Sequence, residues 1–213
     1  MKLSYLMEKN NNNKTTACYL NHLSLMDSLK GYASPKSKLT TLIKSGEMIR
    51  IKRNLYLPGN ESDYSVMTLA NIIFGPSYIS FETALSYYNL IPEKVYSVLS
   101  ATYKKNKNKT FKTPVGNFAY KYINPFIYPY GIRRIVEGGH AFLIADPEKA
   151  LCDTLSKITG VRSIEQFEAL LFDDLRINRS ILQSMDVKFI SLLAPLYKKN
   201  TIRLLDQYIK KRT

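Results

Sequence analysis

A clear helix start stands in the first quarter of the chain. Ser34 is a favoured N-cap residue, and Pro35 is a favoured first helical residue. Gly46 is the type of residue on which a helix ends in a left-handed conformation. These signals predict a helix over about 35–45.

The apolar residues of this helix share one face. Leu39, Leu42 and Ile43 stand at spacings of three and four. The opposite face is short, polar and positive, and it holds Lys36, Ser37, Thr40, Thr41 and Lys44.

The pattern then changes to the alternation of half-buried strands over residues 48–57. Its inward positions are Ile49, Ile51, Leu55 and Leu57. Lys52, Arg53 and Asn54 form the predicted turn, because Asn tolerates a positive φ. The sequence therefore predicts a hairpin that carries Arg50, Lys52 and Arg53.

An earlier amphipathic helix is predicted over Leu20–Leu29, with a break at Gly31–Ala33. Helix, break, helix and hairpin follow one another as in a winged helix-turn-helix. Short hydroxyls and lysines suit base edges, and hairpin cations suit phosphates. The candidate DNA-binding residues are Ser34, Lys36, Ser37, Thr40, Thr41, Lys44, Arg50, Lys52 and Arg53. The alternative is an ordinary solvated helix and hairpin in a basic protein.

Turn-forming residues over 58–64 predict a boundary between two domains, 1–60 and 61–213. The second is expected to have a strand-containing core over about 61–157 and a helical end over 158–213. Helices are predicted at Val66–Phe74, Glu82–Tyr88 and from Asp146-Pro147 onward. Strands are predicted at Val95–Tyr103, Phe118–Ile123, Ile132–Glu137 and His140–Ala145. The fold class is α+β, a winged helix-turn-helix followed by a mixed domain.

A lysine-rich segment, residues 104–112, is predicted to be a loop between strands. It contains Lys104, Lys105, Lys107, Lys109 and Lys112. Such a loop can bind phosphate or an acidic partner, or it can be a solvated tip that discourages aggregation. Both interpretations stay open.

The charge is unevenly distributed. The 213 residues carry a net charge of +14, and residues 1–60 hold ten basic and three acidic residues. A basic surface favours anionic partners, most often nucleic acid. Residues 1–13 lack the apolar core of a signal peptide, and no apolar run approaches a membrane span. A cytoplasmic protein with no membrane partner is expected.

Catalytic and metal-binding chemistry finds little support. The chain has two His and two Cys, no CxxC pair and no phosphate-binding glycine loop, so neither metal nor cofactor is expected. Cys152 stands in an apolar context that predicts a buried thiol. Asp146 and Glu148 are explained by helix capping, and Asp153 is predicted on a helix surface. The chain is not expected to be an enzyme. Its many tyrosines are interpreted mainly as half-buried core, with stacking on unpaired bases or a protein interface as the alternatives.

Four segments in order across about 75–155 resemble the AbiEi family of antitoxins. They are GPSYISFETALSYYNLIPE at 75–93, SAT at 100–102, TPVGNF at 113–118 and ADPEKALCD at 145–153. The resemblance implies a winged helix ahead of this region, and a repressor of its own operon that binds inverted repeats in double-stranded promoter DNA. It also implies that the second domain counters a cognate nucleotidyltransferase toxin, and it transfers no catalytic residues. The alternative function is a protein-interaction module that neutralises an acidic partner without specific DNA binding.

Overall fold

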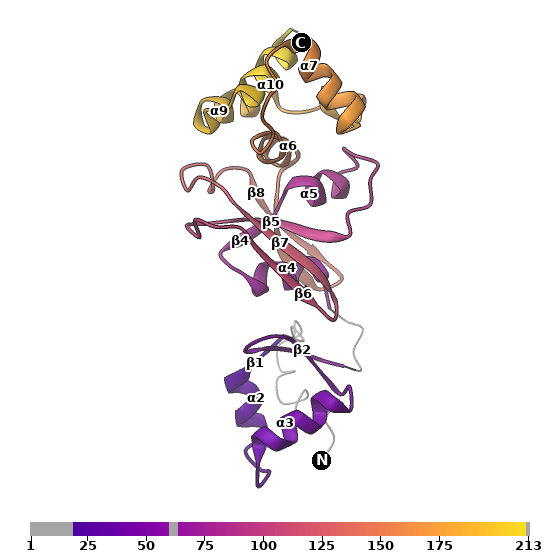
Figure 1. Ribbon diagram of the computed structural model, residues 1–213, viewed down its shortest axis with the longest axis vertical. Helices are drawn as coiled ribbons and strands as arrows, with labels where there is room; N and C mark the ends of the chain where they lie inside the picture. The colour runs from indigo at the N-terminus through magenta and orange to yellow at the C-terminus, as the bar shows by residue number, and fades with distance from the viewer. Residues whose placement is uncertain (1–18, 60–63, 212–213) are drawn as a thin grey trace.

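The computed structural model describes residues 19–59 and 64–211, and the chain is a mixed α+β protein (Figure 1). Its N-terminal part contains β1 (Leu20–Asn21), α2 (His22–Ser28), α3 (Pro35–Lys44), β2 (Met48–Lys52) and β3 (Leu55–Pro58). The strands form an antiparallel sheet in the order β1-β3-β2. The helix predicted over 35–45 and the hairpin after it are both present. Asn54 has φ +66° and Gly46 has φ +76°, as their turn and helix-end positions require.

The first predicted helix, Leu20–Leu29, is shorter than expected. Leu20 and Asn21 pair with β3 as a short strand, and the Asn21 side chain then caps α2 by accepting a hydrogen bond from the Ser24 N–H at 2.8 Å. The prediction began two residues too early because Leu20, a strand residue, and Asn21, the capping residue, also fit the helical pattern.

The larger part is built on a six-stranded mixed sheet in the order β6-β7-β5-β4-β9-β8. Its elements are α4 (Val66–Ile73), β4 (Ser77–Ile79), α5 (Phe81–Tyr87), β5 (Ser97–Thr102), β6 (Lys109–Thr113), β7 (Gly116–Tyr122), β8 (Ile132–Glu137), β9 (His140–Ala145) and α6 (Pro147–Leu155). β5 pairs with β7 and β4 pairs with β9 in parallel, and the other pairs are antiparallel. The hairpin predicted at 132–145 has the predicted bounds. β4 was missed because all three of its residues are buried and show no alternation.

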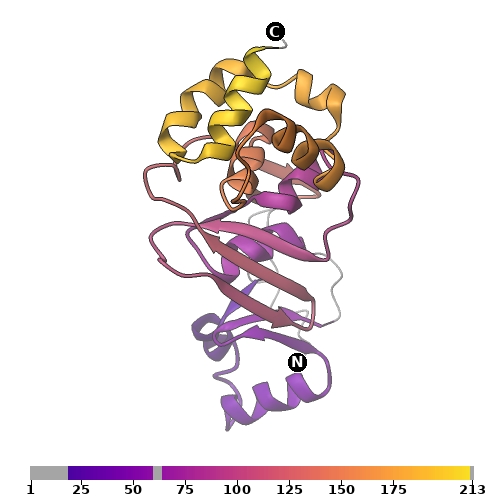
Figure 2. The ribbon, with the colours of Figure 1, turned by 45° about the horizontal axis from the view of Figure 1, so that its top comes forward.

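The C-terminal end is helical, as predicted. It contains α7 (Ile164–Ala169), a π-helical turn η1 (Leu170–Asp174), α8 (Arg179–Gln183), α9 (Val187–Tyr197) and α10 (Asn200–Lys210). Figures 1 and 2 show α6 between the sheet and the last helices. α6 is therefore covered on two sides.

The β2–β3 hairpin contributes to two apolar cores. Tyr56 packs in a small core with the inward residues of α2 and α3. Ile51, Leu55 and Leu57 point the other way and belong to the large core of the six-stranded sheet. Apolar packing therefore continues across the boundary predicted at 58–64, of which residues 60–63 lie outside the described residues.

A fully buried polar network joins α6 to the elements on both sides of it. Lys149 and Asp153, both 0% exposed, form an ion pair at 2.6 Å. Asp153 also accepts hydrogen bonds from Tyr197 at the end of α9 at 2.6 Å, from Tyr78 on β4 at 2.9 Å and from Ser80 before α5 at 2.7 Å. The prediction that Asp153 lies on a helix surface is wrong, because α9 covers the side of α6 that would otherwise meet water.

The two tyrosines of this network keep their phenolic protons. Burial, together with the charge of Asp153, raises the pKa of Tyr78 and of Tyr197 well above the ordinary tyrosine value, so both stay neutral and donate. Cys152 next to the network is fully buried, and burial raises the pKa of its thiol. This agrees with the structural role predicted for Cys152 and disfavours the reactive thiolate form.

Candidate nucleic-acid interface

The position of α3 is fixed by its apolar side. Leu39 and Leu42 are buried against Leu25 of α2, Leu29 directly after α2 and Met48 of β2. Because this side is held inward, the opposite side faces water. All the predicted hydroxyl and lysine positions of that side are exposed, namely Lys36, Ser37, Thr40, Thr41 and Lys44.

The two threonine hydroxyls on α3 are already engaged as donors. Thr40 Oγ1 donates to the Lys36 carbonyl at 3.0 Å, and Thr41 Oγ1 donates to the Ser37 carbonyl at 3.2 Å. Ser34 Oγ donates to Ser37 Oγ at 2.8 Å and does not cap the helix backbone. Each threonine oxygen keeps lone pairs that can accept from the exocyclic amine of adenine or cytosine, and the methyl group of each threonine suits contact with the methyl group of thymine.

The hairpin supplies two exposed cations beside α3. Arg50 lies on β2, and Arg53 lies in the turn before Asn54. The strand register shifts between Arg50 and Lys52, as at a β-bulge, so the two strands do not pair evenly there. Two exposed arginines on this hairpin are available for phosphate contacts.

Lys52 differs from the other predicted contact residues because its ammonium points inward. The side chain is half-buried, donates a hydrogen bond to the Ile73 carbonyl at the end of α4, and lies 5.9 Å from the centre of the Phe111 ring. Burial lowers the pKa of Lys52. Lys52 thus ties the hairpin to the larger part of the chain.

The lysine-rich segment 104–112 is not wholly a loop. Lys109 and Lys112 belong to β6, the edge strand of the sheet, so the loop prediction is wrong for these two residues. Six residues connect β5 to β6. The last part of the segment forms a strand because Phe111 packs against the large core. Lys104, Lys105 and Lys107 precede the strand as predicted.

The structure brings the two predicted cationic regions together at one aromatic ring. Lys109 lies 5.8 Å from the centre of the Phe111 ring, the same ring that Lys52 approaches from the hairpin. Lys105 lies 5.2 Å from the ring centre of Phe74, which itself contacts Phe111. The hairpin and the lysine-rich segment are therefore in contact. Their spacing in the sequence does not predict this contact.

The tyrosines of the middle of the chain mostly pack in the core. Tyr78 and Tyr120 are buried, and Tyr87, Tyr88 and Tyr128 are half-buried. Tyr96 differs, with 89% of its surface exposed.

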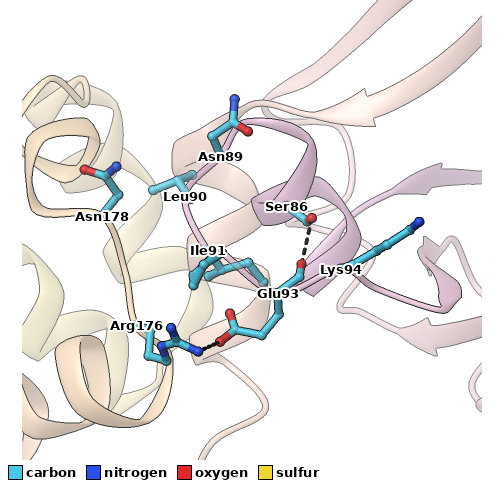
Figure 3. Close-up of a pocket in the computed structure, with 9 residues that line it drawn as sticks. Ser86, Asn89, Leu90, Ile91, Glu93, Lys94, Arg176 and Asn178 are labelled. Atoms are coloured by element: carbon cyan, nitrogen blue, oxygen red, sulfur yellow. Dashed lines mark hydrogen bonds and ion pairs between the residues drawn. The ribbon is translucent and has the colours of Figure 1, made fainter.

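A cleft of about 400 Å³ lies between the end of α5 and the segment that precedes α8 (Figure 3). An ion pair of 2.8 Å between Arg176 and Glu93 crosses it, and Ser86 Oγ donates to the Glu93 carbonyl at 2.9 Å. Asn178 donates its backbone N–H to the Leu90 carbonyl at 2.8 Å. The Arg176–Glu93 ion pair and the Asn178–Leu90 hydrogen bond join the two walls of the cleft. No local sequence pattern indicates these contacts, because the partners are far apart along the chain.

Among residues 19–59 and 64–211, no group of three or more His, Cys, Asp or Glu side chains lies so as to hold a metal ion. No helix in these same ranges has the length and apolar character that crossing a membrane demands. Neither the models of known protein families nor the curated proteins include a match to this chain.

Proposed function

We propose that this chain is a DNA-binding repressor of the winged-helix type, with α3 as the recognition helix and the β2–β3 hairpin as the wing. The observation that carries the proposal is the exposed face of α3, whose hydroxyls and lysines are held outward because the apolar side packs on α2. The hairpin that follows adds the exposed Arg50 and Arg53. Hydroxyls at the helix surface can read base edges, and the arginines can position the duplex.

The lysine-rich segment 104–112 extends the cationic surface of the hairpin. Lys109 and Lys52 share the Phe111 ring, so the lysines of β6 lie close to the wing. We assign this segment a supporting role in attracting the phosphate backbone, since exposed lysines contribute charge without base recognition.

The antitoxin part of the proposal rests on the resemblance to AbiEi proteins. In this proposal the chain acts by binding rather than catalysis, represses its own operon in the cytoplasm, and uses its second domain, 61–213, to counter a nucleotidyltransferase toxin. Two observations on the genome bear on it directly: a neighbouring reading frame for a nucleotidyltransferase, and an inverted repeat in the upstream DNA.

The decisive experiment is a titration of the purified chain against its upstream DNA and against a scrambled duplex of the same length, over a series of salt concentrations. We expect tighter binding to the upstream duplex. Replacing Arg53→Ser should weaken binding to both duplexes and reduce the slope of log K against log salt by about one. Lys188→Ser is the matched control, because Lys188 is exposed on α9 at the other end of the molecule (Figure 1).

Equal binding to the two duplexes would contradict a sequence-specific repressor. It would favour the alternative function, a module that neutralises an acidic partner through the same cationic surface. An Arg53→Ser effect no larger than that of Lys188→Ser would remove the hairpin from the interface.

A further inference from the structure

The two edges of the six-stranded sheet carry different charges. β6 forms one edge and presents Lys109 and Lys112, which repel a second copy of the same strand. β8 forms the other edge, with the sequence Ile-Arg-Arg-Ile-Val-Glu from 132 to 137, and so carries charges of both signs. No strand of the described residues pairs with the outer side of β8.

The pairing of β8 with β9 determines which backbone groups face outward. Arg134 lies opposite Leu143, and Val136 lies opposite Ala141. The Leu143 N–H donates to Asn71 and the Ala141 carbonyl accepts from Thr68, so both β9 residues use their backbone groups on the side away from β8. In an antiparallel pair the opposite residues then point their own groups the other way. The N–H and C=O groups of Arg134 and Val136 therefore face the open edge.

These outward groups permit an antiparallel pairing of β8 with β8 of a second copy. With the two-fold axis at Ile135, Arg134 of each copy lies opposite Val136 of the other, and the outward groups of this pair exchange hydrogen bonds. The neighbouring pair then sets Arg133 against Glu137 on both sides of the axis. An axis at Arg134 would instead place two arginines directly opposite each other, which is unfavourable.

The charged side chains keep atoms available for this pairing. Within the described part of the chain, Arg133 uses its Nε on Asp146 at 2.7 Å, and Glu137 accepts from Tyr87 through Oε1. The Nη groups of Arg133 and Oε2 of Glu137 remain for the second copy. On the other face of the strand pair, Val136 is 53% exposed, and the pairing would place it beside the apolar stem of Arg134 of the second copy.

We propose that two copies of this chain associate through their β8 strands, antiparallel and centred on Ile135, so that the two sheets become continuous. Charge complementarity selects the second copy as occupant of this edge. The association does not depend on DNA binding, so its test can fail or succeed independently of the proposed function.

Sedimentation equilibrium of the full chain over a series of concentrations tests the association. The wild-type mass should rise from 24.5 kDa toward twice that value as concentration increases. Val136→Lys should hold the mass at the monomer value, because it places an ammonium opposite Arg134 on both sides of the axis. Combining it with Arg134→Glu should restore the dimer, because the pair then has opposite charges.

Thr110→Lys is the matched control, since Thr110 is an exposed β-branched residue on the other edge strand, β6. It should dimerise like the wild type, and all variants should melt with the wild-type cooperativity. A wild-type chain that stays monomeric at every concentration would overturn the proposal and leave the edge for a different protein. Dissociation by Thr110→Lys as well would place the contact elsewhere, and failure of the double variant to reassociate would overturn the register.

Discussion

α3 and α6 have similar sequences at their starts and very different surroundings. Each has a polar residue at the N-cap position followed by proline, at Ser34-Pro35 and Asp146-Pro147, and neither polar side chain bonds to the helix backbone. Their lengths are ten and nine residues. Yet α3 buries only Leu39 and Leu42, whereas α6 buries every residue from 149 to 155. α3 is covered on one side and α6 on two, by the sheet and by the last helices. The number of covering layers, rather than the helix itself, decides whether a lysine stays exposed to solvent or forms a buried ion pair.

The largest effect is expected from removing a charge within α6. Asp153→Ala leaves the ammonium of Lys149 buried beside neutral groups, and it should lower the free energy of unfolding by about 3–5 kcal/mol. Thr41→Ala on the exposed side of α3 serves as control and should change stability by less than about 0.5 kcal/mol. Denaturant titration at fixed temperature measures both.

The double variant Lys149→Met with Asp153→Leu distinguishes charge from packing. It removes both charges, and we expect it to be more stable than Asp153→Ala alone. Both variants lose the hydrogen bonds of Tyr78, Tyr197 and Ser80 to Asp153. If the double variant were nevertheless less stable than the single one, misfit of the larger apolar side chains and loss of the Lys149–Tyr197 hydrogen bond would outweigh the cost of an unpaired charge.

On α3 the expected effect is on binding and not on folding. Thr40→Ala should reduce the preference for the upstream duplex over a scrambled one by about 1–3 kcal/mol if Thr40 contacts a base edge. Its hydroxyl donates to the Lys36 carbonyl, so the oxygen is expected to accept from a base amine. Competition titrations with both duplexes measure the preference. An equal loss for the two duplexes would indicate a phosphate contact instead.

The N-terminal elements could be predicted because their signals are local. Pro35, Gly46 and Asn54 each favour the backbone conformation at their own position, and the structure has α3 and the hairpin turn there. The surroundings of α6 depend on α9, which follows much later in the chain, and no local pattern reports that contact. One signal did exist: Lys149 and Asp153 stand four apart on a helix whose other residues in that stretch are apolar or small, which suits an internal ion pair as well as a solvated one.

The smallest effect is expected at Lys52, which is intermediate between the exposed lysines of α3 and the buried Lys149. Lys52→Met removes its hydrogen bond to the Ile73 carbonyl while keeping an apolar stem over Phe111. Because the side chain is only half-buried, we expect a loss of about 1 kcal/mol in unfolding free energy, with the salt dependence of DNA binding nearly unchanged. Arg53→Met, one residue away in the exposed turn, should show the reverse: unchanged stability and weaker binding to every duplex. If Lys52→Met instead reduced the salt slope as much as Arg53→Met does, the ammonium of Lys52 would leave Ile73 to meet a phosphate in the complex, and the hairpin would bind DNA with three cations rather than two.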